Sequence, residues 1–223
     1  MPPVTRTTEP PRRGGRGARQ RILKAAAELF YCEGINATGV ELIANKASVS
    51  KRTLYQHFPS KSALVEEYLR GLRQAAGEAD KMPKASNATP RERLLALFDR
   101  PNRGDGRMRG CPFHNAAVEA AGEMPGVERI VHSHKRDYIK GLARLAREAG
   151  AAHPRSLGNQ LAVLFEGAAA LSTSLDDAGP WAHARAAAEV LIDQATARPV
   201  RTRHRNGWGF VHAHVVRWPA ARV

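Results

Sequence analysis

The interior of this sequence repeats its apolar side chains every three to four residues, which is the spacing of an α-helix with one buried face. Ile22 and Leu29 belong to the first such series, and Gly34 supplies a stop for it, which predicts a helix over 18–33. Alternating strand patterns are almost absent, apart from a short run near 210–216. The sequence therefore predicts an all-α fold.

Capping residues and prolines divide the remaining pattern into further helices. Thr38 and Glu41 form a T-x-x-E capping box, which predicts the start of a second, short helix before a turn over 47–50. Thr89 and Glu92 form another capping box ahead of the fifth helix. The third to ninth helices are expected over 50–57, 60–81, 90–100, 113–122, 127–149, 154–176 and 180–197.

Two short helices joined by a four-residue turn, behind a longer first helix, match a helix-turn-helix, whose second helix enters the DNA major groove. Residues 45–61 carry four basic side chains and no acidic one, which supports contact with a polyanion. A helical wheel of 50–57 separates an outward face, Lys51, Arg52, Tyr55 and Gln56, from an inward face, Ser50, Thr53, Leu54 and His57. The outward face is therefore expected to meet DNA.

The outward side chains suit DNA for different reasons. Lys51 and Arg52 can pair with phosphates or with guanine edges. Gln56 can read adenine, and the Tyr55 hydroxyl can donate to a phosphate. Lys61 falls at the positive start of the fourth helix, where backbone amides favour an anion. The alternative interpretation is an ordinary solvated face, which is the commonest role of charges on a surface helix.

The overall charge also favours a polyanionic partner, with nucleic acid as the first candidate. Lys and Arg total 35 against 21 Asp and Glu, a formal charge of +14. Residues 1–17 are rich in Pro, Gly and Arg and are expected to be a disordered basic arm. The basic tail over 199–223 holds five arginines and no acid. It is either a segment that strengthens nucleic-acid binding or a poorly ordered extension.

Several other classes of protein are disfavoured. No apolar stretch in residues 1–20 suits a signal peptide, and the two cysteines, Cys32 and Cys111, cannot make a disulfide framework, which predicts a cytoplasmic location. The most apolar segment, 161–175, is too short for a membrane span. Because the usual catalytic and metal-binding signatures are absent, neither an enzyme nor a cofactor or metal site is expected.

A set of residues between 19 and 70 forms a recognisable pattern. It comprises Arg21-Ile22-Leu23, Ala26, Leu29-Phe30, Gly34, Thr38, Ile43-Ala44, Val49-Ser50, Thr53-Leu54-Tyr55, His57-Phe58, Lys61 and Leu64. This pattern resembles the N-terminal domain of TetR-family transcriptional regulators. The resemblance implies DNA contacts from Thr38, Lys51, Arg52, Thr53, Tyr55, Gln56, His57 and Lys61. Since the wheel turns Thr53 and His57 partly inward, Tyr55 and Lys61 rank above them.

Two positions depart from the family pattern. Ser48 stands in the turn where the family usually has glycine, and a positive φ at a serine would cost conformational energy. Gly39 stands where a hydroxyl residue is usual, which removes one phosphate donor at the start of the second helix.

The resemblance also implies a division into a helix-turn-helix DNA-binding domain over 18–64 and a helical ligand-binding and dimerisation domain over 65–198. In the implied homodimer, the last two helices of each subunit form a four-helix bundle. The alanines of those helices allow close approach, although alanine also simply reflects helix propensity. The candidate ligand contacts are the larger side chains that could line a cavity, Phe98, Phe113, His114, Tyr138 and Phe165.

The expected function is a homodimeric, sequence-specific regulator of transcription that binds double-stranded DNA. Its simplest form is a repressor that a small-molecule effector releases from a palindromic operator. The alternative is a constitutive or architectural DNA-binding protein without ligand control. Dependence on base sequence separates the two, because specific binding exceeds non-specific binding by about a thousandfold or more.

Overall fold

The computed structural model of the protein describes residues 17–81, 88–99 and 109–197. Within these ranges every regular element is an α-helix, which confirms the predicted fold class. In chain order the helices are α1 (Ala18–Cys32), α2 (Val40–Lys46), α3 (Lys51–His57), α4 (Lys61–Lys81), α5 (Pro90–Ala96), α6 (Pro112–Glu119), α7 (Pro125–Glu148), α8 (Pro154–Leu175) and α9 (Gly179–Thr196). Residues 1–16 of the predicted arm and the 199–223 tail, with its short run near 210–216, lie outside the described residues.

Two helices end earlier than the sequence pattern predicts. Helix α5 ends at Ala96 rather than near residue 100, because the Phe98 amide donates to the Leu95 carbonyl (2.9 Å) in a tighter turn. Helix α6 ends at Glu119 rather than at residue 122, and Gly122 then takes a left-handed φ of +77°. Apolar spacing continues past both ends and therefore overestimates the helix lengths.

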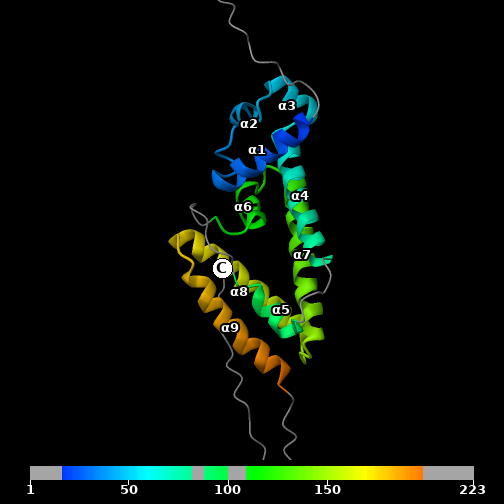
Figure 1. Ribbon diagram of the computed structural model, residues 1–223, viewed down its shortest axis with the longest axis vertical. Helices are drawn as coiled ribbons and strands as arrows, with labels where there is room; N and C mark the ends of the chain where they lie inside the picture. The colour runs from blue at the N-terminus through cyan, green and yellow to red at the C-terminus, as the bar shows by residue number, and fades with distance from the viewer. Residues whose placement is uncertain (1–16, 82–87, 100–108, 198–223) are drawn as a thin grey trace, which may run out of the picture.

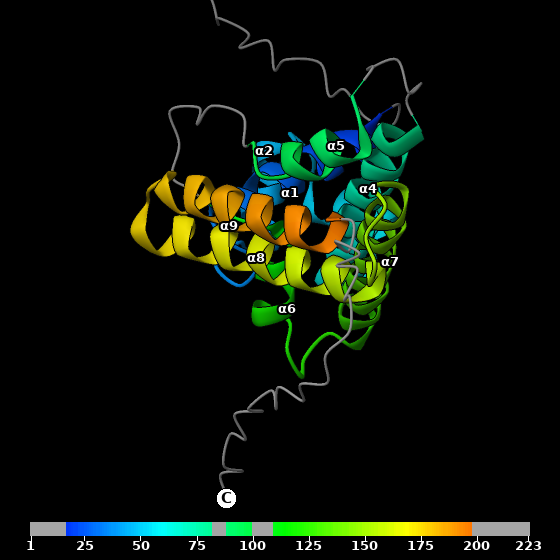
Figure 2. The same cartoon turned by 90° about the horizontal axis from the view of Figure 1, so that it is seen from below.

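The helices form an elongated molecule with α1, α2 and α3 gathered at one end (Figure 1). Helices α4 and α7 pack side by side along its length, and α7 also packs against α8. Helices α8 and α9 lie alongside each other (Figure 2). One apolar cluster runs from Ile22 in α1 through Leu69 in α4 to Ile192 in α9, and each of these three side chains is fully buried.

Helix α4 joins the N-terminal helices to the rest of the molecule. Its first two turns bury Leu64 and Val65 against the N-terminal helices, and the Tyr68 ring lies 5.7 Å from the ring of Phe30 in α1. Burial raises the pKa of Tyr68 to about 12, so this side chain stays neutral. The predicted boundary between residues 64 and 65 falls inside α4, so a movement of α4 is shared by both parts.

The turn between α2 and α3 is a Schellman motif with a serine where glycine is usual. The Ser48 amide donates to the Asn45 carbonyl and the Val49 amide donates to the Ala44 carbonyl, both at 3.0 Å. Ser48 has a φ of +52°. Ser48 therefore has the positive φ that the sequence analysis considered. This conformation raises the free energy of the folded state.

Helices α7 and α8 approach closely because Gly158 lacks a side chain. A Cβ at this position would lie 2.8 Å from the backbone nitrogen of Ala143, which is closer than real Cβ contacts. The glycine therefore sets the distance between these two helices.

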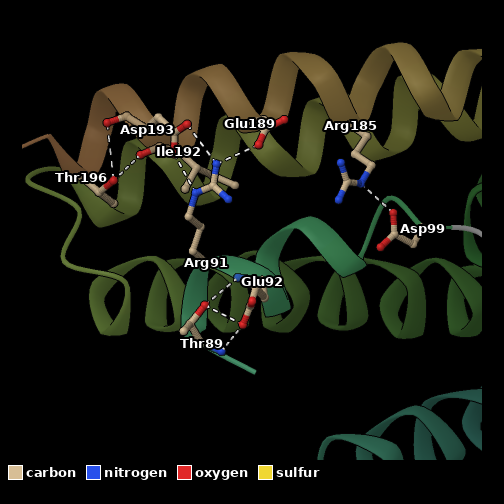
Figure 3. Close-up of polar contacts among 9 residues, drawn as sticks. All are labelled: Thr89, Arg91, Glu92, Asp99, Arg185, Glu189, Ile192, Asp193 and Thr196. Carbon is tan, nitrogen blue, oxygen red and sulfur yellow. Dashed lines mark hydrogen bonds and ion pairs between the residues drawn. The ribbon is translucent and has the colours of Figure 1, made fainter. Parts of the chain in front are cut away.

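Ion pairs attach α9 to α5 across the molecule (Figure 3). The guanidinium of Arg91 donates to Asp193 at 2.7 Å and to Glu189 at 2.8 Å, and Arg185 donates to Asp99 at 2.7 Å. The capping box of Thr89 and Glu92 that the sequence predicts is confirmed at the start of α5. It fixes the first turn of α5, which presents Arg91 to α9.

Candidate nucleic-acid interface

Helix α3 is held by one buried side chain and one cap. Ser50 is its N-cap, and its Oγ accepts a hydrogen bond from the Thr53 amide at 3.0 Å. Leu54 is fully buried in the core. The turn before α3 is held from α1, since the Arg21 Nε donates to the Ala47 carbonyl at 3.1 Å. These contacts leave the opposite face of α3 open to solvent.

The open face carries the four side chains that the helical wheel placed outward. Lys51, Arg52 and Gln56 are exposed, and Tyr55 is 46% exposed. Lys51 forms an ion pair with Glu41 of α2 at 3.0 Å. Because both of these side chains are well exposed, the pair is weak, and a phosphate could replace the carboxylate.

The wheel was wrong about His57, which is exposed rather than inward. The chain turns out of the helix at Phe58, which has an extended conformation and is itself buried. Thr53 is partly buried as predicted, and its hydroxyl lies 2.9 Å from the Ser50 hydroxyl. His57 therefore joins the exposed face, while Thr53 supports the helix start.

Thr38 requires two corrections. Its hydroxyl donates to the Gly34 carbonyl at 2.6 Å and does not cap α2, whose N-cap is Gly39. Thr38 is also fully buried, so its side chain cannot reach a phosphate. The hydroxyl ties α2 to the end of α1 instead, which is a packing role that sequence spacing cannot distinguish from a cap.

Lys61 lies at the first turn of α4, beside the loop that leads into α2. Its Nζ donates to the Asn36 carbonyl at 3.5 Å, and Ser60 caps the helix by accepting from the Ala63 amide. Burial lowers the pKa of Lys61, while the nearby carboxylates of Glu119 and Glu123 act in the opposite direction.

Helix α6 is bound to the same loop. The Glu119 carboxylate accepts from the Asn36 amide at 2.8 Å, and the Asn36 side chain donates to the Glu119 carbonyl at 3.0 Å. At the other end of α6, the Arg109 Nε donates to the Tyr31 carbonyl at 2.8 Å. Two separate contacts therefore connect α6 to the segment that positions α2 and α3.

A cavity of about 350 Å³ lies between α4, α5 and α7, in the part of the molecule away from α3. Its apolar wall includes Leu97, Leu142 and Leu145. Its polar side chains are largely paired with one another: Arg73 with Asp137, and Arg93 with Glu148 at 3.3 Å. This volume lies within the range of small-molecule sites.

The five predicted ligand residues do not line one cavity. Tyr138 lines the cavity between α4, α5 and α7, whereas His114 is exposed beside a separate hollow between α6 and α8. Phe98 packs edge-on to Phe165 at 6.3 Å, and Phe113 stacks on a histidine of α7. Phe98 and Phe113 are buried in the core, and Phe165 packs against it half-buried, which is the usual role of aromatic rings in a protein interior.

The cavity residues that the sequence interpretation missed come from distant parts of the chain. His134 lines the cavity and stacks on Phe113 with ring centroids 3.5 Å apart. Burial, followed by the charges of Lys135 and Arg73, lowers its pKa, so His134 is neutral at pH 7. Arg73 and Asp137 are 64 residues apart. No local spacing in the sequence could have indicated that pair.

An apolar groove runs along α8 and α9. Its lining includes Val163, Leu171 and Leu175, which are 72%, 55% and 63% exposed. Large apolar side chains gathered in one groove are typical of a surface that another protein covers.

Two further properties of the described residues bear on function. Within residues 17–81, 88–99 and 109–197, no group of three or more His, Cys, Asp or Glu side chains could hold a metal ion. In the same part of the chain, no helix is long and apolar enough to cross a bilayer.

Comparison with known proteins identifies the family. The sequence profile described as "Bacterial regulatory proteins, tetR family" matches residues 22–68, which are the helix-turn-helix and the start of α4. A crystal structure of a TetR transcriptional regulator from Streptomyces avermitilis is 31% identical, with a TM-score of 0.68 over 80% of this chain and 97% of that one. The chain belongs to the TetR family. Another TetR-family regulator, from Streptomyces coelicolor, is 26% identical with a TM-score of 0.72, over 81% of this chain and 96% of its own.

Curated relatives described as HTH-type transcriptional regulators match part of the chain. The transcriptional repressor KstR2 of Mycobacterium tuberculosis is 39% identical over 80 residues, which are 36% of this chain and 40% of that protein. The transcriptional activator FasR of Mycolicibacterium smegmatis is 42% identical over 76 residues, 29% of this chain and 35% of that protein. The match therefore spans about two fifths of these relatives' length.

Proposed function

We propose that this TetR-family protein is a cytoplasmic, homodimeric repressor of transcription, released from a palindromic operator by a small molecule. The observation that carries the proposal is the exposed face of α3, where Lys51, Arg52, Tyr55 and Gln56 stand free of the core. These side chain types contact phosphates and base edges in major-groove complexes. Most of the similar curated proteins carry the name repressor, and one is named an activator.

A second copy of this chain is the proposed occupant of the apolar groove on α8 and α9. An operator with two half-sites needs two recognition helices about 34–36 Å apart, which a twofold dimer supplies. Leu171→Lys should shift the protein from dimer to monomer in sedimentation experiments, because a charge would be buried at the interface. Val118→Lys is the matched control, since Val118 is 66% exposed on α6 outside the groove.

The proposed effector site is the cavity between α4, α5 and α7. Helix α4 lines this cavity through Arg73 and begins at Lys61 beside the helix-turn-helix. A ligand that separates α4 from α7 would therefore change the position of α3 relative to its copy in the dimer. Gly141 lines the cavity, and a Cβ there meets no atom within 4 Å. Gly141→Leu should fill part of the cavity and abolish the response to effector while leaving DNA binding intact.

The DNA half of the proposal is tested by selecting bound duplexes from a random pool. We expect a palindromic sequence, bound about a thousandfold or more tightly than random duplex. Tyr55→Ala and Arg52→Gln should each weaken binding of that sequence, whereas Arg129→Gln, an exposed arginine on α7, should not. Selection without any preferred sequence, together with a steep dependence on salt, would instead indicate an architectural DNA-binding protein.

A further inference from the structure

The arginines of the described residues fall into two groups. Most donate to a carboxylate or a backbone carbonyl, as Arg73, Arg91 and Arg109 do. In a few, the guanidinium has neither a hydrogen bond nor an ion pair to any other described residue: Arg52, Arg136, Arg144, Arg147 and Arg155. Arg52 lies on the proposed DNA-binding face of α3. The other four lie on α7 and at the start of α8, where the proposed function assigns no partner.

Three of these arginines and one lysine converge on two adjoining hollows at the turn between α7 and α8. Lys140, Arg144, Arg147 and Arg155, which we call the α7–α8 basic patch, line a hollow of about 360 Å³. Arg147 and Arg155 also line a second hollow of about 460 Å³. The lining of the first hollow also includes the apolar side chains of Ile139 and Ala143 and the amide side chain of Asn159.

The patch is electrostatically unbalanced. Neither hollow has an acidic residue in its lining. The nearby carboxylates each have an arginine partner outside the patch: Asp137 pairs with Arg73, and Glu148 pairs with Arg93. Asp137 also forms a long ion pair with Lys140 of the patch, at 3.9 Å. Like charges gathered around one hollow repel one another, so an anion that enters it is stabilised by all four cations.

The spacing of the patch suits an anion with more than one charged group. Lys140, Arg144 and Arg147 stand at positions i, i+4 and i+7 of α7, on one side of the helix, and span about 10 Å along it. Arg155 approaches from α8. A guanidinium binds phosphate oxygens through two parallel N–H donors, which favours phosphate over a simple halide ion.

From these observations we infer that the α7–α8 basic patch is a binding site for a small molecule with two or three phosphate groups. The site is distinct from the DNA-binding face and does not depend on it. Figure 1 shows the α7–α8 turn at the end of the molecule away from α3, so a duplex lying on α3 does not reach it. A hollow lined in part by apolar side chains suits a compact ligand better than a straight duplex.

The site is also placed where a ligand would affect the rest of the molecule. The Ala152 amide, in the turn beside Arg147 and Arg155, donates to the Ala195 carbonyl of α9 at 2.9 Å. A phosphate compound that draws α7 and α8 together would therefore act on the turn that also holds the end of α9.

The test is a calorimetric titration of the full chain with inorganic tripolyphosphate at physiological ionic strength. We expect saturable binding, with one compound per subunit, and much weaker binding of inorganic phosphate. The double variant Arg147→Gln/Arg155→Gln should weaken tripolyphosphate binding about tenfold or more, because two charge-assisted contacts are lost. Both side chains are exposed, so the thermal unfolding of the variant should match that of the parent.

Two control variants make the outcome decisive. Arg129→Gln/Arg136→Gln removes the same charge from exposed positions of α7 outside both hollows, and Lys51→Gln/Arg52→Gln removes it from the DNA-binding face. Both should keep the parent affinity for tripolyphosphate. Equal weakening in all three variants would show diffuse attraction to net charge and overturn the site. Loss of duplex binding in Arg147→Gln/Arg155→Gln would also overturn it, in favour of a nucleic-acid surface.

Discussion

The strained turn before α3 can be tested against a second turn of the same kind in the same protein. Ser48 and Gly150 occupy the same position in two Schellman motifs, at the ends of α2 and α7. In the second motif the Gly150 amide donates to Arg147 and the following amide donates to Ala146, both at 3.0 Å. The two positions have φ values of +52° and +87°. Ser48→Gly should therefore stabilise the protein, and Gly150→Ser should destabilise it.

The magnitude follows from the conformational energies of serine and glycine. A residue with a Cβ in the left-handed region costs about 1–2 kcal/mol. Glycine offsets part of this, because its greater freedom in the unfolded chain costs about 0.4–1 kcal/mol. The net gain expected for Ser48→Gly is about 1 kcal/mol in the free energy of unfolding. For a protein of this size, that gain raises Tm by about 2–4 °C.

Urea unfolding and thermal melts at one fixed protomer concentration measure the effect, since a dimer's apparent stability depends on concentration. Ser48 is exposed, and a Cβ at Gly150 would meet no atom within 4 Å, so packing does not contribute at either position. The double variant Ser48→Gly/Gly150→Ser should return close to the parent value, because distant sites add. Operator affinity should be unchanged in Ser48→Gly.

A loss of stability in Ser48→Gly would refute this reasoning, since it would mean that the serine side chain contributes more than its backbone costs. No change in Gly150→Ser would refute it equally, because that position isolates the effect of φ.

Three further predictions concern packing and protonation. Gly158→Ala should lower the free energy of unfolding by about 1–3 kcal/mol, because the added methyl group meets the backbone of α7; Gly71→Ala, where a Cβ meets nothing, should not. The hydrogen bond from Arg91 holds the pKa of Asp193 below its ordinary 3.8. This contact therefore stabilises the fold at neutral pH, and the stabilisation is lost as the pH falls below about 4. Carbon-13 NMR should show the pKa of Asp193 rising toward 3.8 in Arg91→Gln. Burial holds the pKa of His134 below 6.5. As the pH drops below about 6.5, His134 therefore takes up a proton in the unfolded chain before it does so in the folded one, and the free energy of unfolding should fall. If His134→Gln showed the same dependence of stability on pH as the parent, this reasoning would be contradicted.

The sequence was sufficient for those features that depend on local spacing. Helices such as α3 and α5 are predicted because caps at Ser50 and Thr89 and apolar residues every three to four positions act within a single turn. The same local logic placed Tyr55 and its neighbours on an outward face. The resemblance to the family, rather than local spacing, drew attention to Ser48, and it left open whether the turn needs a positive φ.

Tertiary packing determined which side chains near the helix ends are buried and which side chains come together, and local spacing does not settle either. Thr38 is buried where its hydroxyl bonds the end of α1, and His57 is exposed where the chain leaves α3 at Phe58. A helical wheel contains neither fact. The cavity beside His134 and the α7–α8 basic patch bring together side chains from different helices. Whether a charged side chain finds a partner depends on helices that meet only after folding. The number of arginines can therefore be read from the sequence. Only the folded structure shows which of them pair with a carboxylate and which remain available to the proposed ligand.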